Sequence, residues 1–334
     1  MKYVKFSKPS KDMRDIRKSF FSENKKFLKI AKRANTFYSK QKTRKHCKNC
    51  GSQISGKIFS QFHAHYTVCS KCSHFNGFYE DTNNFTNFLY KDSGGSGYYK
   101  FLLKNFDERV KKIYLPKVNF LRQVIKDKII VNDIGSGAGH FLSALEKVNI
   151  NGTGYEPSKQ LVNLGKTKLK KNKIHFVEFS SIYSKILKDR SSNTLTLMGV
   201  LEHLQSPNKI LETFCKSSFK YLYFSVPLFS FSVFIENCFK NVYPRHLSEG
   251  HTHLYTEKSL RYLAKKFNLK IIGEWWFGSD FPDLFRSIVL ESNTRNPKKY
   301  LQHLNHNFGS NIDEFQKILD KNKICSQVHM VLKK

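Results

Sequence analysis

From Lys128 onward the sequence alternates short β-rich runs with stretches of helical periodicity. Seven such runs can be counted, from KIIVNDI at residues 128–134 to SQVHMVLKK at residues 326–334, and amphipathic segments separate most of them. Repeated strand–helix units favour a parallel sheet with helices on both faces. We therefore predict an α/β fold over residues 129–334, with a doubly wound, Rossmann-like and mostly parallel sheet of seven strands.

A glycine-rich loop follows the first predicted strand. In VNDIGSGAGHF, residues 131–141, the strand ends just after Asp133, and Gly135, Gly137 and Gly139 follow with one residue between each. Glycine permits a sharp turn and lets a ligand approach the backbone, because no Cβ atom is in the way. In doubly wound sheets, ligands bind at the carboxyl ends of the strands. The loop is therefore a predicted ligand-binding site.

Two acids narrow the choice of ligand. Glu156 lies roughly seventeen residues beyond the loop, at the end of the second predicted strand, where a carboxylate can accept both ribose hydroxyls of a nucleoside. The loop reads G-S-G-A-G rather than the dinucleotide fingerprint G-x-G-x-x-G, and the carboxylate of Asp133 would repel a pyrophosphate. A ligand with a cationic end fits better, and the ammonium of S-adenosylmethionine (SAM) is such an end.

Three motifs in order, VNDIGSGAG, GYEPS and LMGVLEHLQSP, closely resemble those of class I SAM-dependent methyltransferases. The resemblance covers some two thirds of the chain, from about Lys100 to the C-terminus, and it implies a last strand inserted antiparallel. Near adenine the family often has an acid, whereas this chain has serines. By resemblance, the methionine part of SAM contacts Asp133, Gly135, Ser136, Gly137 and Gly139; the ribose contacts Glu156; adenine lies near Ser180 or Ser181; and the sulfonium lies beside Met198 and Gly199.

Four cysteines precede this domain in two C-x-x-C pairs. Cys47 and Cys50 form the first pair, and Cys69 and Cys72 follow roughly eighteen residues later, with an alternating, strand-like segment between the pairs. This spacing is typical of a four-cysteine zinc site, and a site with no open position is structural. The alternatives are unrelated thiols or disulfides, which a chain without an export signal disfavours. We predict a zinc-ribbon-like segment over residues 46–90.

The acceptor side is expected near the ends of the fourth and fifth strands. Glu202 and His203 in VLEHL, and His251 and His253 in HLSEGHTHLYTEKSL, are candidate general bases or acceptor ligands, because a neutral imidazole can remove a proton near pH 7. The alternatives are that His203 packs at a helix start and that the later histidines are solvated. The segment FSVPLFSFSVFIENCF is a candidate aromatic lid. Further candidates for the far wall of the acceptor pocket are Trp275, Asp280 and Arg286, although Asp280 could instead cap a helix.

The chain is strongly basic, with 58 Lys and Arg against 26 Asp and Glu and a formal net charge of +32. An anionic partner and the bias of an AT-rich genome both explain such a balance. Residues 1–45 are expected to be a basic, solvated and partly helical extension, with a nucleic-acid-binding arm as the alternative. Residues 91–128 are expected to be a helical lead-in, with a flexible joint at KDSGGSG. No apolar segment follows Met1 and none reaches ~20 residues, so we expect no signal peptide, no membrane span and a cytoplasmic protein.

The order of a zinc ribbon followed by a methyltransferase domain looks like that of sugar methyltransferases from surface-polysaccharide and deoxysugar pathways. This resemblance implies a small anionic acceptor, a nucleotide-linked sugar above all. C-methylation is doubtful, because the chain after the sixth strand is too short for the further domain of those enzymes. The alternatives are an RNA methyltransferase, which the charge favours, and a non-catalytic module that binds zinc and SAM.

Overall fold

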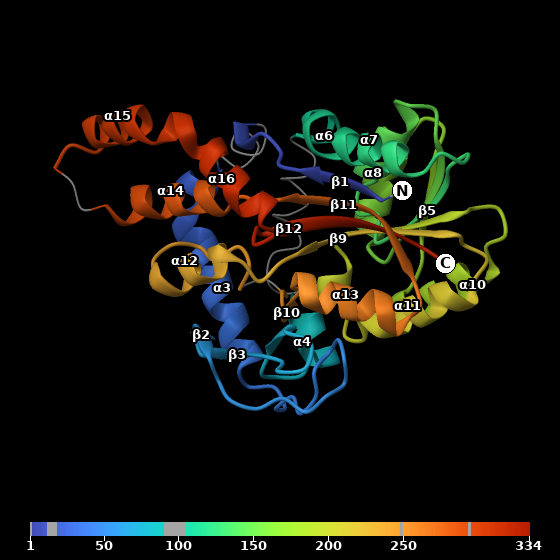
Figure 1. Cartoon of the computed structure of the whole chain (residues 1–334), viewed down its shortest axis with the longest axis horizontal. Coiled ribbons are helices and arrows are strands. Elements are labelled where there is room, and N and C mark those ends of the chain that lie inside the picture. The colour runs from blue at the N-terminus through green and yellow to red at the C-terminus, as the bar shows by residue number, and fades with distance from the viewer. Residues whose placement is uncertain (1, 12–18, 90–104, 248–249, 293–294) are drawn as a thin grey trace.

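The computed structural model describes residues 2–11, 19–89, 105–247, 250–292 and 295–334, and a central eight-stranded sheet organises them (Figure 1). The strands are β1 (Tyr3–Phe6), β5 (Ile130–Ile134), β6 (Asn151–Glu156), β7 (Lys173–Phe176), β8 (Thr194–Met198), β9 (Tyr221–Pro227), β11 (Lys270–Phe277) and β12 (Gln327–Lys333). Their order across the sheet is β1-β11-β12-β9-β8-β5-β6-β7. The mostly parallel, Rossmann-like sheet is confirmed.

The seven predicted strands are all present, and β12 runs antiparallel to both β9 and β11, as the resemblance implied. The predicted count needs one correction. β1, at the N-terminus, pairs in parallel with β11 as an eighth strand, so that Tyr3 lies opposite Gly273 and Phe6 opposite Trp276. Part of the segment expected to be a solvated extension therefore completes the edge of the main sheet.

Helices cover both faces of this sheet (Figure 1). One core lies under the helices α10 (Ile182–Lys188), α11 (Pro207–Lys216) and α13 (Glu257–Lys266). The opposite core lies under α7 (Leu115–Val124), α8 (His140–Glu146) and α9 (Lys159–Lys168). The alternation of side chains along a strand supplies both cores. In β9, Leu222, Phe224 and Val226 enter the first core, while Tyr221 and Tyr223 enter the second.

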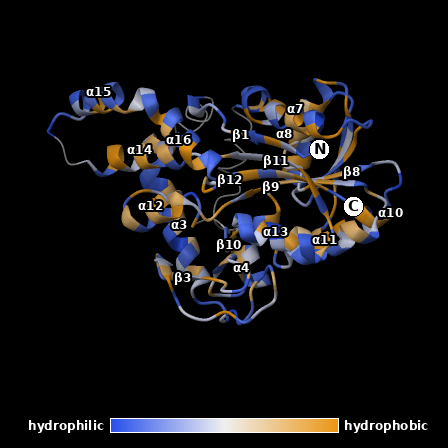
Figure 2. Cartoon of the chain, in the orientation of Figure 1, coloured by the Kyte–Doolittle hydropathy of each residue, from blue (hydrophilic) through white to orange (hydrophobic). Residues whose placement is uncertain are grey.

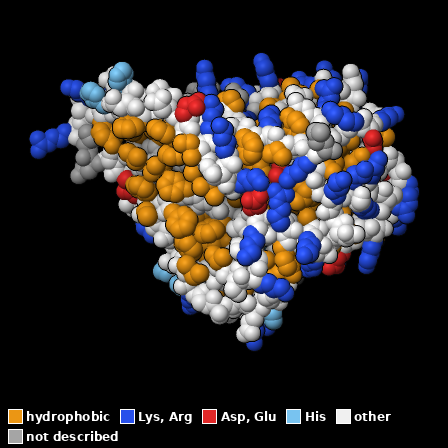
Figure 3. Space-filling model, in the orientation of Figure 1, with side chains coloured by type: hydrophobic (Ala, Val, Ile, Leu, Met, Phe, Trp, Pro, Cys, Tyr) orange, Lys and Arg blue, Asp and Glu red, His pale blue; other side chains and the backbone are white. Residues whose placement is uncertain are grey.

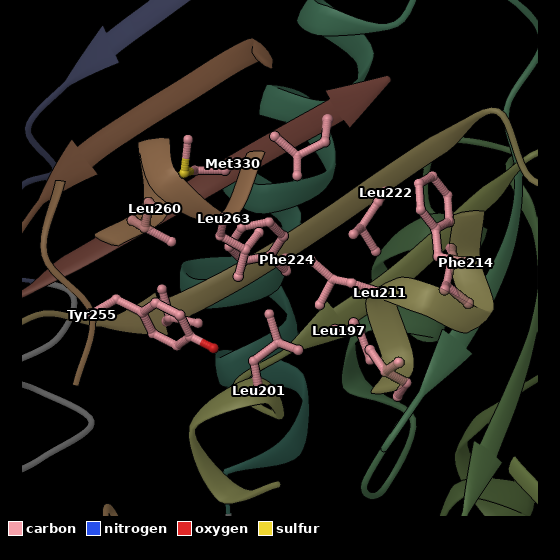
Figure 4. Packing of buried hydrophobic residues seen from close by; sticks show 14 of the residues in the cluster. Leu197, Leu201, Leu211, Phe214, Leu222, Phe224, Tyr255, Leu260, Leu263 and Met330 are labelled. Carbon is pink, nitrogen blue, oxygen red and sulfur yellow. The ribbon is translucent and has the colours of Figure 1, made fainter. Parts of the chain in front are cut away.

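Figure 4 shows part of the first core, where leucines from α11 and α13 lie against β9. Phe224 is completely buried in it. We expect Phe224→Ala to lower the free energy of unfolding by about 3–5 kcal/mol, because the substitution loses the transfer energy of the ring and leaves a cavity. Denaturant unfolding checks this value, with the exposed Phe308 on the surface as the matched site for a control Phe308→Ala.

A second, four-stranded antiparallel sheet has the order β10-β4-β3-β2. Its strands are β2 (Phe59–Gln61), β3 (Ala64–Val68), β4 (Phe75–Gly77) and β10 (His253–Leu254). The short helix α4 (Asn83–Asn87) follows β4 in the chain. The predicted strand pair between the cysteine pairs is confirmed by β2 and β3. β10 comes from the domain that carries the main sheet, so the small sheet is built from both parts of the chain.

Helix α3 (Asn24–Tyr38) corrects the expectation of a solvated N-terminal extension. Its apolar side buries Leu28, Ala31, Ala34 and Tyr38, and Tyr38 belongs to the core of the small sheet. The division of the chain at residues 45, 90 and 128 stays a prediction. Backbone pairing joins the predicted parts, because β1 in the first part pairs with β11 in the last, and β4 in the second part pairs with β10 in the last. The predicted flexible joint at residues 91–97 lies outside the described residues.

Between β11 and β12 the chain forms α14 (Asp280–Glu291), α15 (Pro297–Asn307) and α16 (Ile312–Lys321), of which the sequence analysis considered only a helix near Asp280. The predicted aromatic lid includes α12 (Phe231–Cys238), which packs against α14. Figures 2 and 3 show apolar residues gathered on this side of the molecule. The ring of Phe281 on α14 contacts the ring of Phe231 on α12 and the ring of Phe315 on α16. Among the described residues, no helix combines the length and apolar composition needed to cross a membrane.

Candidate functional site

The glycine loop lies directly after β5, at the carboxyl edge of the sheet. Gly135, Gly137 and Gly139 have φ angles of +67°, +55° and +78°, a region that other residues rarely adopt. A Cβ atom on Gly135 would lie 2.7 Å from the side chain of Val200, whereas one on Gly137 would meet no atom within 4 Å among the described residues beyond its own chain neighbours. Packing therefore requires the first glycine, while Gly137 borders open space. Ser136 adds a buried hydroxyl without a hydrogen-bond partner in the described part of the chain.

Glu156 lies beside this open space. Its Oε2 accepts a hydrogen bond of 2.9 Å from the N–H of Gly137, and its Oε1 accepts one of 3.0 Å from the N–H of Ser158 at the start of α9. Burial raises the pKa of this carboxyl above its usual value, and the two backbone hydrogen bonds oppose the shift. The carboxylate therefore holds the loop in shape, and its oxygens keep lone pairs that a ribose could use.

Asp133 is buried at the end of β5, where it accepts a hydrogen bond of 2.5 Å from the hydroxyl of Thr196 on β8. Burial raises the pKa of Asp133 to about 7, against the opposing effects of the Thr196 hydroxyl and of Lys117. Lys117, on α7, is itself buried, and burial lowers its pKa to about 7. Sequence reasoning did not single out Lys117, because it is one of many lysines and no motif surrounds it.

The remaining residues assigned by resemblance lie at the same edge. Ser180 and Ser181 are exposed in the turn Phe179–Ser181, three residues beyond the end of β7. Met198 ends β8 half-buried, and Gly199 follows with a φ of +73°. Their contacts with adenine and with the sulfonium stay predictions.

The structure brings three of the four acceptor-side candidates together. Glu202 and His203 lie on the turn Leu201–His203, just after β8, and His251 precedes β10. The nearest carboxylate and imidazole atoms of the three residues all lie within 4.8 Å of one another. Burial raises the pKa of Glu202 to about 8 and lowers that of His203 to about 4. We call these three residues the Glu–His cluster.

His253, the fourth candidate, lies outside the Glu–His cluster. It is completely buried on β10, and its Nδ1 forms a hydrogen bond of 2.9 Å with Nε2 of His74, a residue of the zinc-ribbon-like segment. Burial lowers the pKa of both imidazoles, so the pair is neutral near pH 7. The hydrogen bond between His253 and His74 links two distant parts of the chain. A role for His253 as a general base stays a prediction.

The expected far wall of the acceptor pocket is corrected. Trp275 is buried in the core of the sheet, where its Nε1 donates to the carbonyl of Ser7. Asp280 is buried and accepts hydrogen bonds from the hydroxyls of two serines that lead into α12, rather than capping its own helix. Arg286 is buried and donates to the carbonyl of Tyr243. All three side chains hold the fold together.

The four cysteines form a compact cluster. Sγ of Cys47 lies 3.7 Å from Sγ of Cys72, and Sγ of Cys50 lies 3.5 Å from Sγ of Cys69. Disulfide sulfurs would be ~2.05 Å apart. A tetrahedral zinc ion with Zn–S bonds of ~2.3 Å places sulfurs roughly 3.8 Å apart. The donor set and its spacing therefore fit a structural zinc ion, and the amide nitrogen of Asn76 lies 3.5 Å from Sγ of Cys47.

The first cysteine knuckle is anchored to the acceptor side. Nζ of Lys48 donates to the carbonyl of Leu204, 2.7 Å away and directly after His203, and it pairs with Asp81. The amide of Asn49 donates to the carbonyl of Ser259 in α13, and the amide of Asn208 donates to the carbonyl of Asn49. The cysteine cluster thus positions the turn that carries the Glu–His cluster.

Comparisons with known proteins agree with this architecture. The model of a family described as "Methyltransferase domain" matches residues 106–274, half of the chain, and this match includes the glycine loop and the Glu–His cluster. A search of curated proteins finds no match. Similar solved structures include a SAM-dependent methyltransferase from Archaeoglobus fulgidus, at 17% identity and a TM-score of 0.46, over 72% of this chain and 100% of that one. Magnesium protoporphyrin IX methyltransferase from Synechocystis PCC 6803, solved with bound SAH, matches at 10% identity and a TM-score of 0.48, over 76% of this chain and 100% of that one.

Proposed function

Since the chain belongs to the methyltransferase domain family and is a SAM-dependent methyltransferase, we propose that it methylates a small anionic acceptor, a nucleotide-linked sugar or a surface-polysaccharide precursor. The observation that carries the SAM site is the loop after β5. There Gly137 borders open space and donates to Glu156, Ser136 offers a hydroxyl without a partner among the described residues, and Asp133 ends the strand before the loop. These groups suit a ligand with an ammonium at one end and a ribose at the other.

Bound SAM supplies an electrophilic methyl group on a sulfonium. In the proposed site Asp133 attracts the ammonium, the loop N–H groups face the carboxylate of the methionine part, and Glu156 accepts the ribose hydroxyls. Met198 and Gly199 border the sulfonium, and Ser180 lies toward adenine. The chain itself contributes position and the removal of the acceptor proton, which is most of what a methyl transfer requires from a protein.

We propose that the acceptor approaches the Glu–His cluster at a small hollow that would admit one of its hydroxyl groups. The residues that line this hollow are Asp81, Phe85, Thr86, Leu89, His203, Gly250 and Thr252. Hydroxyl and carboxyl groups next to an aromatic ring suit a polyhydroxylated acceptor such as a sugar. The excess of basic residues would attract the phosphates of a nucleotide-linked sugar. We propose that the cysteine cluster holds a structural zinc ion that keeps this pocket in place.

We expect Glu156→Ala to weaken SAM binding by roughly 1–3 kcal/mol, or about 5- to 150-fold, because charge-assisted hydrogen bonds to the ribose and the tie to the loop are both lost. Isothermal titration with SAM measures this change. Glu212→Ala, which removes an exposed carboxylate on α11, is the control and should bind like the wild type. Equal affinities for both variants would remove Glu156 from the proposed site.

The pKa of Asp133 gives a second expectation. Because burial raises this pKa to about 7, the carboxyl is largely neutral below pH 7 and becomes an anion above it. The affinity for SAM should therefore fall as the pH is lowered from about 7.5 to 6, by at most ~10-fold per pH unit. Asp133→Asn, measured by the same titration, should bind weakly with little dependence on pH over this range. A wild-type affinity that is constant with pH would contradict the role of Asp133.

The net charge of +32 favours RNA as a second candidate acceptor. An RNA methyltransferase of this charge should bind RNA with an affinity that falls steeply with salt, by ~10³-fold or more between 50 and 200 mM. Filter binding of a transfer RNA mixture over this range tests the alternative. A weak or shallow dependence leaves the small-molecule acceptor in place.

A further inference from the structure

The Glu–His cluster contains two buried polar atoms that no group among the described residues satisfies. Oε2 of Glu202 and Nδ1 of His251 are both buried, and neither has a hydrogen-bond partner in the described part of the chain. A buried polar atom without a partner costs free energy, so such atoms call for a ligand, an ion or a water molecule. One carboxylate oxygen of Glu202 and one ring nitrogen each of His203 and His251 also lie within 4.8 Å of one another.

We propose that Glu202, His203 and His251 bind one divalent metal ion, separate from the ion of the cysteine cluster. The nearest donor atoms lie within 4.8 Å of one another. Around a common ion with bonds of ~2.0–2.2 Å, they would lie roughly 3.4 Å apart, so that closure requires side-chain shifts of about 1 Å. Two imidazoles and one carboxylate suit zinc, iron, cobalt or nickel rather than magnesium or calcium.

Backbone groups near the Glu–His cluster orient both imidazoles as metal ligands. His203 forms a hydrogen bond with the backbone of Gly250, and His251 forms one with the backbone of His246. In metal sites a histidine commonly donates one ring nitrogen to a carbonyl, which fixes the tautomer and directs the other nitrogen to the ion. For His251 the nitrogen left over is the buried, unpartnered Nδ1. The backbone therefore already holds both imidazoles in the way that histidine ligands of metal ions are commonly held.

Three protein ligands leave a coordination position open, as in catalytic rather than structural sites. His203 also lines the hollow proposed for the acceptor, so an acceptor hydroxyl could take that position. A bound divalent ion lowers the pKa of a hydroxyl, whose proton then passes to solvent. The oxygen forms a bond to the methyl carbon while the carbon–sulfur bond breaks, with its electron pair left on sulfur. This role rests on the proposed function, whereas the metal site itself does not.

Cobalt titration of the full-length protein tests the site. Co²⁺ is added to protein whose cysteine cluster retains its purified metal, and the visible absorption of nitrogen- and oxygen-bound cobalt is recorded. We expect one equivalent to bind without thiolate-to-cobalt bands, and we expect Glu202→Gln and His251→Ala to weaken this binding at least ~100-fold. His303→Ala, which removes an exposed histidine of α15, should bind like the wild type.

Titration with SAM separates the possible failures. Variants that keep their SAM affinity are folded, and loss of the cobalt signal in them then supports the site. An unchanged cobalt signal in both variants, or no signal in a wild type that binds SAM, overturns the metal proposal and leaves the proposed function standing. A cobalt signal in a wild type that binds no SAM overturns the proposed function instead.

Discussion

Replacing Cys72 with serine is expected to lower the free energy of unfolding by more than about 4 kcal/mol, which for a chain of 334 residues corresponds to a melting temperature lower by roughly 6 °C or more. Cys72 is completely buried, its Sγ lies 3.7 Å from that of Cys47, and the amide of Asn49 approaches it to 3.6 Å. Serine cannot replace a thiolate ligand, so we expect the proposed zinc ion to be lost. The cysteines belong to a small hydrophobic cluster of their own, so the loss of the ion would first disturb the packing around the two knuckles.

The loss should reach the acceptor side before the SAM site. The cysteine knuckle anchors Leu204 through Lys48 and anchors α13 through Asn49. Methyl transfer by Cys72→Ser is therefore expected to fall more than its affinity for SAM. Cys238→Ser, which changes an exposed free cysteine, should alter the free energy of unfolding by less than ~0.5 kcal/mol. Thermal melts measure the stability of both variants, and elemental analysis measures their zinc content. A Cys72→Ser protein as stable as Cys238→Ser would exclude a structural metal.

Replacing Gly137 with leucine is expected to weaken SAM binding at least ~100-fold. With a φ of +55°, the Cβ of the new side chain would enter the open space beside the loop, where no other part of the described chain lies within 4 Å. The leucine would occupy the volume proposed for the methionine part of SAM. The left-handed backbone adds a strain of ~1–2 kcal/mol, which by itself lowers stability rather than affinity.

Gly56 provides a matched control for that strain. Its φ is +75°, and a Cβ atom there would also meet nothing within 4 Å, but Gly56 lies in the zinc-ribbon-like segment. Gly56→Leu should therefore show a similar loss of stability with an unchanged affinity for SAM. If both variants bound SAM equally well, the open space beside Gly137 would not be the binding site.

Local patterns were enough to predict the strands and the loop. The run that forms β9, YLYFSVP, is almost continuously apolar because the strand is buried on both faces of the sheet. The left-handed glycines were also predictable, since three glycines after a strand indicate a turn that other residues cannot make. These features depend on neighbours within a few residues of the chain, which a sequence shows directly.

Features that depend on distant contacts were missed. The residues of β1 read as part of a basic tail, and only their pairing with β11, some 270 residues later, makes them a sheet edge. His253 was indistinguishable from His251 in the sequence, and the partner that separates them, His74, lies 179 residues away. The low pKa of Lys117 comes from its burial on α7 rather than from any motif. These features depend on tertiary packing, which the periodicity of a sequence does not show.

Calorimetric titration of the full-length protein with SAM tests the central claim most directly. We expect one molecule of SAM to bind per chain, Glu156→Ala to bind more weakly, and Gly137→Leu to show almost no heat of binding while Gly56→Leu binds normally. A wild-type protein that is folded but gives no heat with SAM or SAH, or a Gly137→Leu variant with full affinity, would contradict the assignment of the loop after β5 as the SAM site.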